Sequence, residues 1–133
     1  MDIALCRINT KTKTVEYAGA HRPLYVMNNG VMEEVKGDKF PIGGGVAKNQ
    51  TSFTSTKIKL QSGDSIYFSS DGYPDQFGGT DVRKFGSKRV RELIENVHHM
   101  PANQSAQIFD QKWEDWRGAQ KQTDDVLMIG IKF

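Results

Sequence analysis

The sequence predicts an α+β domain in which most strands pair antiparallel. Short apolar segments with alternating polarity occupy residues 3–69, two segments of helical periodicity lie within 87–118, and one further apolar segment covers 126–132. Strands followed by helices and then a strand are typical of α+β folds rather than of a regular β-α alternation. With 133 residues, of which 37% are hydrophobic, the chain fits one domain.

The first strands are expected to form a meander. Residues 3–8 are apolar on both faces, which predicts a central strand. Residues 14–18 alternate with period two and predict the next strand. The segments 24–27 and 31–35 flank Asn28-Asn29-Gly30, and an Asn-Gly turn between apolar runs predicts a β-hairpin.

The middle of the chain combines loops with two further strands. Residues 37–49 contain proline and a run of glycines, and they predict a loop. Residues 52–60 alternate again and predict a strand, which the polar turn at 61–64 ends. Residues 65–69 predict another strand, apolar at its centre, that leads directly into Asp-Gly at 71–72.

Two amphipathic helices are expected before the last strand. The first has an apolar stripe at Val90, Leu93, Ile94 and Val97. The second presents one face through Ala106, Phe109, Trp113 and Trp116. Ser87 is the expected N-cap of the first helix, and Gly118 is the expected C-cap of the second.

Composition and charge exclude several classes of protein. No apolar run approaches the ~20 residues that a membrane span needs. The single cysteine, Cys6, rules out an internal disulfide framework and a zinc site built on cysteines, and we expect a reducing, cytoplasmic setting. The net charge of +2 does not by itself indicate nucleic-acid binding. Five basic residues cluster within 83–91, where a solvated helix start is favoured over a patch for an acidic or phosphorylated partner.

Acidic residues at strand ends are the main chemical signal. Asp71 follows the strand at 65–69, and Asp124 and Asp125 precede the strand at 126–132. If these strands are antiparallel neighbours, Asp71 and Asp124 meet at one edge of the sheet. Carboxylates held together repel each other unless a cation lies between them, and oxygen ligands suit Mg²⁺ or Mn²⁺.

A purely structural interpretation of these aspartates is open. Asp-Gly is a common turn, and an aspartate before a strand is often a cap or a solvated loop residue. From spacing alone this interpretation is favoured, because short motifs match by chance. Other candidates are weaker: His21 beside Arg22 in a tight connection is more often structural, and no serine lies in a Gly-x-Ser-x-Gly elbow.

Several segments match one family pattern in the right order. The strongest is Gly-Asp-Ser-Ile-Tyr-Phe-Ser-Ser-Asp-Gly-Tyr at residues 63–73, and the last is Gln-Thr-Asp-Asp-Val-Leu-Met-Ile-Gly at residues 122–130. Shorter matches lie at residues 1–6, 15–20, 23–26, 41–44 and 75–79. Together they resemble the SpoIIE-type bacterial serine/threonine phosphatases of the metal-dependent protein phosphatase (PPM) superfamily.

This resemblance implies a fold and an active site. The family fold is an α-β-β-α sandwich, with two antiparallel sheets between helices and two Mn²⁺ or Mg²⁺ ions at one end. By the match, Asp71 and Asp124 are metal ligands and Asp125 is a neighbour, which reverses the preference drawn from spacing. The implied reaction is metal-assisted hydrolysis of phosphoserine or phosphothreonine on a bacterial signalling protein, by a water that two cations activate.

The resemblance also implies an incomplete domain. The family's catalytic domain begins upstream of the segment that matches Met1, with a strand whose aspartate bridges both metals. Residues 1–133 are therefore expected to be a single domain, the C-terminal portion of the catalytic domain without its N-terminal strands and helices, and inactive or nearly so alone. An uncovered strand edge or apolar face makes a homodimer a reasonable expectation.

Partners follow from the same likeness. It implies a phosphorylated protein substrate and an upstream sensor or receiver domain, with no nucleic acid and no membrane contact from this segment. The alternative is a non-catalytic, partner-binding regulatory module of the same fold. A nucleic-acid module, suggested only by residues 83–91, ranks third.

Overall fold

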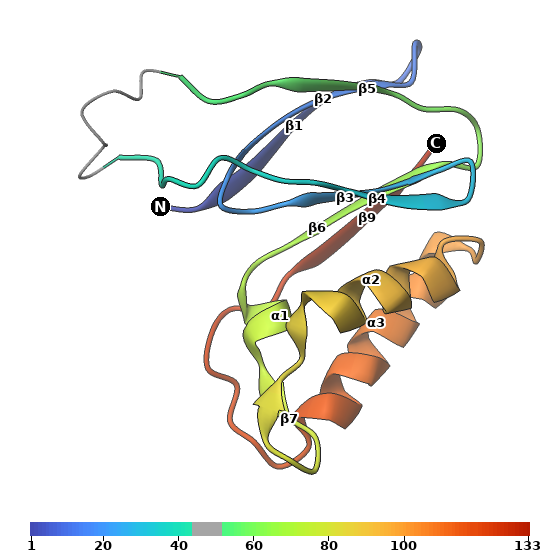
Figure 1. Ribbon diagram of the computed structural model, residues 1–133. Coiled ribbons are helices and arrows are strands. Elements are labelled where there is room, and N and C mark those ends of the chain that lie inside the picture. Colours follow the sequence, from blue (N-terminus) through green and yellow to red (C-terminus); the bar gives the residue numbers. More distant parts are fainter. Residues whose placement is uncertain (44–51) are drawn as a thin grey trace.

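Two stacked antiparallel sheets and one layer of helices make up the protein (Figure 1). The computed structural model describes residues 1–43 and 52–133. Sheet A contains, in spatial order, β1 (Ile3–Asn9), β2 (Thr14–Ala20) and β5 (Thr56–Lys59). Sheet B contains, in spatial order, β4 (Val31–Val35), β3 (Leu24–Asn28), β6 (Ser65–Ser69) and β9 (Met128–Lys132). Every strand pair within these sheets is antiparallel, as predicted.

The helices lie on one side of the sandwich. Between β6 and β9 the chain forms α1 (Gly72–Asp75), a small hairpin of β7 (Phe77–Gly78) and β8 (Arg83–Lys84), α2 (Gly86–Val97) and α3 (Ala102–Arg117). Helices α2 and α3 cover the face of sheet B that points away from sheet A (Figure 1). The predicted α+β sandwich with two helices before the last strand is confirmed. Among the described residues, only sheet B has a helical layer.

Strand β3 supplies two separate hydrophobic clusters. Leu24 and Val26 face sheet A and join the cluster between the sheets, whereas Tyr25 and Met27 join the cluster under the helices. All four are buried, which explains why the sequence is apolar at consecutive positions. Burial of one such side chain stabilises the fold by about 1.5–3 kcal/mol. Sheet B is therefore fixed from both faces.

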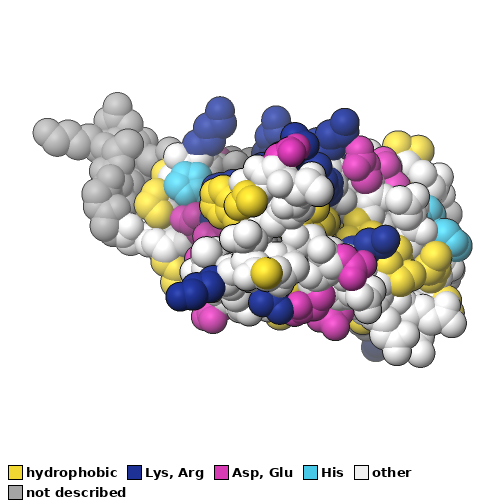
Figure 2. Space-filling model, turned by 90° about the horizontal axis from the view of Figure 1, so that it is seen from below, with side chains coloured by type: hydrophobic (Ala, Val, Ile, Leu, Met, Phe, Trp, Pro, Cys, Tyr) yellow, Lys and Arg dark blue, Asp and Glu magenta, His cyan; other side chains and the backbone are white. Residues whose placement is uncertain are grey.

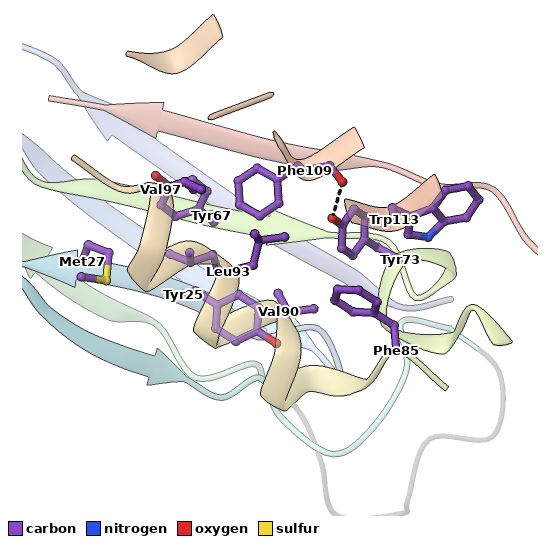
Figure 3. Packing of buried hydrophobic residues seen from close by; sticks show 11 residues of the cluster. Tyr25, Met27, Tyr67, Tyr73, Phe85, Val90, Leu93, Val97, Phe109 and Trp113 are labelled. Carbon is purple, nitrogen blue, oxygen red and sulfur yellow. Dashed lines mark hydrogen bonds between the residues drawn. The ribbon is translucent and has the colours of Figure 1, made fainter. Parts of the chain in front are cut away.

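Aromatic residues dominate the cluster under the helices (Figure 3). The Tyr73 hydroxyl donates a hydrogen bond of 2.7 Å to the carbonyl oxygen of Phe109 in α3. The two rings lie 6.2 Å apart at 77°, an edge-to-face arrangement that aromatic pairs prefer. The neighbouring Tyr67 ring also contacts Phe109, but its buried hydroxyl has no hydrogen-bond partner among residues 1–43 and 52–133.

The hairpin prediction is confirmed in detail. Strands β3 and β4 pair with Asn28 opposite Val31, so Asn29 and Gly30 form the two-residue turn. Both turn residues have positive φ, 50° and 76°, as the type I′ turn requires.

Two strand expectations differ from the structure, and one loop expectation lies partly outside the described residues. Strand β1 lies at the edge of sheet A rather than at its centre, and Leu5 on its outer face is 63% exposed. Burial against the described residues therefore does not explain why β1 is apolar on both faces. Strand β5 occupies only part of 52–60, and the loop predicted at 37–49 lies partly outside the described residues.

The helix faces are largely as predicted, with two exceptions. Val90, Leu93, Ile94 and Val97 are all buried, and Gly118 is the C-cap of α3. Ser87 is not an N-cap: α2 begins at Gly86, because the preceding residue Phe85 is drawn into the aromatic cluster. Ala106 is exposed, and its place on the buried face is taken by Ser105, whose hydroxyl bonds to the Val97 carbonyl oxygen at 3.0 Å. In the described part of the chain, no helix has the length and apolar composition needed to cross a bilayer.

Replacement of Tyr73 by phenylalanine should destabilise the fold by about 1 kcal/mol, because it removes a buried hydrogen bond. Tyr67→Phe is the matched control: it removes a buried hydroxyl that has no partner, so it should be neutral or stabilising. Urea unfolding followed by tryptophan fluorescence reports on both, since Trp113 lies in the same cluster. Equal losses in the two variants would contradict this assignment.

Candidate functional site

The end of β6 and the segment before β9 are tied together by one serine. The Ser70 hydroxyl donates to the Asp125 carbonyl oxygen at 2.7 Å and accepts from the Leu127 amide at 2.9 Å. The Ser70 amide also donates to the Leu127 carbonyl oxygen at 3.0 Å. Strands β6 and β9 are antiparallel neighbours, which is the condition under which Asp71 and Asp124 are expected to meet. Asp71 consequently lies beside the segment that contains Asp124 and Asp125.

Gly72 allows this close approach. A Cβ atom at Gly72 would overlap the carbonyl oxygen of Asp125, lie 2.9 Å from its carbonyl carbon and 3.3 Å from that of Asp124. Only a residue without a side chain fits here, so the Asp-Gly sequence has a packing reason besides its turn. The turn itself is the start of α1, where the Asp75 amide donates to the Asp71 carbonyl oxygen at 2.9 Å.

The two predicted ligands have different hydrogen-bond partners. The Asp71 side chain is 44% exposed, and its Oδ2 accepts a charged hydrogen bond of 3.0 Å from Arg22 Nη2. Asp124 Oδ1 accepts from the backbone amide of Asp125 at 2.7 Å. The topology places the two residues at the same end of the sandwich. Their role as metal ligands stays a prediction.

Arg22 joins Asp71 to a second carboxylate. The same Nη2 atom donates to Asp2 Oδ2 at 2.9 Å, and His21 Nδ1 lies 3.1 Å from Asp2 Oδ1. Hydrogen bonds from His21 and then Arg22 hold the pKa of Asp2 below its usual value, because they stabilise the charged form. Asp2 precedes β1, Arg22 lies between β2 and β3, and Asp71 follows β6. The cluster therefore draws on both sheets.

The backbone at Arg22 is held closely by its neighbours. The Tyr17 hydroxyl donates to the Arg22 carbonyl oxygen, and burial raises the pKa of Tyr17 to about 12, so the donor proton is retained at neutral pH. Gly19 and Gly37 pack against the same carbonyl oxygen, where a Cβ on either would lie 2.5 Å and 3.0 Å from it. His21 has a positive φ of 59°, and its backbone amide donates to the carbonyl oxygen of Asp38 at 2.8 Å.

An open cavity of about 430 Å³ lies over this cluster, lined in part by Asp2, Arg22, Ser70 and Asp71. Its carboxylate oxygens are the donors that Mg²⁺ and Mn²⁺ prefer, so the residues present fit a divalent cation in kind. Within residues 1–43 and 52–133, however, no group of three or more His, Cys, Asp or Glu side chains could hold a metal ion. The carboxylates of the described residues could therefore supply part of the coordination sphere of a divalent cation.

A second cavity of about 470 Å³ lies between α3 and β9, away from these carboxylates. Aromatic and aliphatic side chains such as Phe109, Trp113 and Met128 form much of its wall. Neither Asp71 nor Asp124 lines it, and it lies where α3 packs on sheet B.

The basic cluster at residues 83–91 is engaged in local contacts. Four of its members form ion pairs: Arg83 with Asp81, Lys84 with Asp75, Lys88 with Glu92, and Arg91 with Glu34. Arg89 donates to the Phe85 carbonyl oxygen and lies 4.2 Å from the centre of the Trp116 ring. From the helical side, basic and acidic side chains lie among scattered hydrophobic ones (Figure 2). This pairing favours the interpretation of the cluster as a solvated helix start.

Sequence reasoning did not find the Asp2–Arg22–Asp71 cluster. It favoured a structural role for His21, named Arg22 only as its neighbour, and gave Asp2 no role. The available signal was topological: Asp2 and Arg22 flank strands that β1–β2 pairing brings to one end, since Ile3 lies opposite Ala20. The stacking of the two sheets determines which end of sheet B lies against Asp2 and Arg22. The sequence pattern does not show how the sheets stack.

Comparison with known proteins gives a consistent picture. The model of the family "Stage II sporulation protein E (SpoIIE)" matches residues 1–133. The structure is similar to the SiaA-PP2C domain of Pseudomonas aeruginosa, with 27% identity and a TM-score of 0.89 over 99% of this chain and 51% of that one. No curated protein matches the chain in sequence.

More distant structures share the fold. The phosphatase domain of SpoIIE from Bacillus subtilis, presoaked with Mn, has 12% identity and a TM-score of 0.71 over 98% of this chain and 56% of that one. The serine/threonine phosphatase PstP/Ppp of Mycobacterium tuberculosis has 12% identity and a TM-score of 0.53 over 97% and 58%. The chain thus spans little more than half the length of the solved chains it matches.

Gly72→Ala tests the close approach at this site. Alanine in a helix ordinarily stabilises relative to glycine by about 0.5–1 kcal/mol. Here the added methyl group overlaps the Asp125 carbonyl oxygen, so we expect a loss of about 1–3 kcal/mol in the free energy of unfolding. Denaturant titration decides by the sign of the change, and a stabilised Gly72→Ala variant would contradict the contact.

Proposed function

Since the chain belongs to the SpoIIE family, we propose that it is part of a PPM-type serine/threonine phosphatase domain. The proposed reaction is metal-dependent hydrolysis of phosphoserine or phosphothreonine on a signalling protein. Residues 1–133 would be the C-terminal portion of the catalytic domain, in keeping with the share of related chains that they cover.

One observation supports this proposal more than any other. Asp71 and the segment containing Asp124 come from positions far apart in the sequence, yet Ser70 and Gly72 bring them against each other at one end of the sandwich. A purely structural Asp-Gly turn would not require a distant acidic segment beside it. The Mn-presoaked phosphatase domain of SpoIIE from Bacillus subtilis shares the fold, which makes Mn²⁺ the first cation to test.

The chain's own residues have defined tasks in this reaction. Asp71 and Asp124 would hold a divalent cation, and Ser70 and Gly72 keep their backbones in register. In this class of hydrolysis, divalent cations activate the attacking water and neutralise charge on the phosphoryl oxygens. Arg22 lines the same open cavity and donates a hydrogen bond to the Asp71 carboxylate. No side-chain nucleophile is required.

Partners and setting follow from the same assignment. We propose a phosphorylated protein as substrate, an upstream sensor or receiver domain in the longer chain, and a cytoplasmic setting. The homodimer stays a prediction, for which the exposed outer face of β1 is the available surface. The alternative function is a partner-binding module that has kept the fold without catalysis.

Asp71→Asn in the full-length protein separates these two functions. We expect a loss of Mn²⁺-dependent hydrolysis of a phosphoserine peptide by at least about 100-fold, because the amide cannot supply a charged ligand. Asp75→Asn is the matched control, since Asp75 lies one helical turn away and pairs with Lys84 at the surface. Phosphatase activity that Asp71→Asn leaves unchanged would remove the catalytic proposal.

The isolated segment is a second test. We expect residues 1–133 alone to hydrolyse the same peptide at close to the uncatalysed rate, because the described residues bring together no group of three metal-binding side chains. The comparison is the full-length protein at equal concentration with MnCl₂. Comparable rates for the two would show that the site is complete within these residues.

A further inference from the structure

Arg22 occupies an unusual place in the fold. It lies in the connection between β2 and β3, where the chain crosses from sheet A to sheet B. One nitrogen of its guanidinium bonds to Asp2, ahead of the first strand of sheet A, and to Asp71, at the end of a strand of sheet B. The side chain is 22% exposed, so these bonds are partly shielded from water.

We infer that Arg22 is a positioning residue for the cation site: it fixes the orientation of the Asp71 carboxylate, and Asp2 in turn holds the guanidinium and offsets its charge. This inference rests on the function proposed above. Arg22 acts through Asp71 and touches no reacting atom.

The first argument is geometric. The bond from Arg22 uses Oδ2 of Asp71, which restricts rotation of the carboxylate and leaves Oδ1 without a hydrogen-bond partner among the described residues. Partners of this kind typically affect metal affinity by about 10- to 100-fold when they are removed. The backbone that carries the donor is held in place, because Tyr17, Gly19 and Gly37 enclose the Arg22 carbonyl oxygen. The guanidinium itself is held by its hydrogen bond to Asp2.

The second argument concerns charge. A guanidinium beside a cation site repels the cation unless an anion compensates it. Asp2 is bonded to the same Nη2 atom at 2.9 Å, and His21 and Arg22 lower its pKa, so it is a carboxylate at neutral pH. The Asp2–Arg22 pair has no net charge. Arg22 can thus orient Asp71 without opposing a divalent ion.

Titration calorimetry of the full-length protein with MnCl₂ tests the inference. Arg22→Gln should weaken Mn²⁺ binding by about 10-fold or more, and Arg22→Lys should weaken it less, because lysine keeps the charge but not the planar geometry. Asp2→Asn should also weaken binding, and it should add little in the Arg22→Gln background. Arg7→Gln is the matched control, since Arg7 pairs with Glu16 at 2.5 Å elsewhere on sheet A.

Kinetics at saturating Mn²⁺ provide a second readout. The KM for a phosphoserine peptide should change by less than about threefold in Arg22→Lys. An unchanged or tighter Mn²⁺ affinity in Arg22→Gln overturns the inference, as does a raised KM with unchanged Mn²⁺ affinity, which would make Arg22 a phosphate-binding residue. An equally large effect of Asp2→Asn with and without Arg22 also overturns it, since Asp2 would then act directly on the ion.

Controls keep the inference separate from the proposed function. If Arg22→Gln does not fold by circular dichroism, Arg22→Lys and Asp2→Asn supply the same comparison. If the Asp71→Asn variant binds Mn²⁺ with wild-type affinity, the proposed function itself is wrong. Lost affinity in Asp71→Asn with normal affinity in every Arg22 variant would end only the positioning role.

Discussion

Antiparallel pairing of β6 with β9 is the constraint on which the rest of the structure depends. It joins Ser70 to Asp125, which lie 55 positions apart in the sequence, and so determines which side chains share one end of the sandwich. The same pairing closes the long excursion that contains both major helices, because that excursion leaves sheet B at β6 and returns at β9. The aromatic cluster and the candidate site are therefore two results of one strand contact.

Burial on both faces makes sheet B the rigid centre of the domain. Strands β3 and β6 contribute alternate side chains to the two hydrophobic clusters, so a shift of either strand would disturb both. Sheet A, covered on one face by the described residues, contributes the other half of the candidate site through Asp2. Arg22 lies in the connection between the two sheets and bonds to a carboxylate from each. Stacking of the sheets and geometry of the site are consequently linked.

Local pattern predicted much of this fold. The Asn29-Gly30 hairpin and the buried stripe of α2 follow from short-range spacing and are found in the structure. The strands that flank Asp71 and Asp124 are also predicted locally, whereas their antiparallel pairing is only a condition that the structure fulfils. The errors arise where packing overrides local preference: Ser87 lost its capping role because Phe85 is buried, and Ser105 replaced Ala106 on the inner face of α3. The Asp2–Arg22–Asp71 cluster could not be predicted, because it depends on how two sheets stack rather than on any spacing along the chain.

The long separation between β6 and β9 also has a consequence for synthesis. At ribosomal rates of about 5–20 residues per second, the strand that completes sheet B, β9, has emerged roughly 3 to 12 seconds after Ser70. During that interval the nascent chain presents β6 as an open edge, with its backbone amides and carbonyls free to pair with another polypeptide. A chaperone that shields this edge until β9 arrives would raise the yield of folded protein.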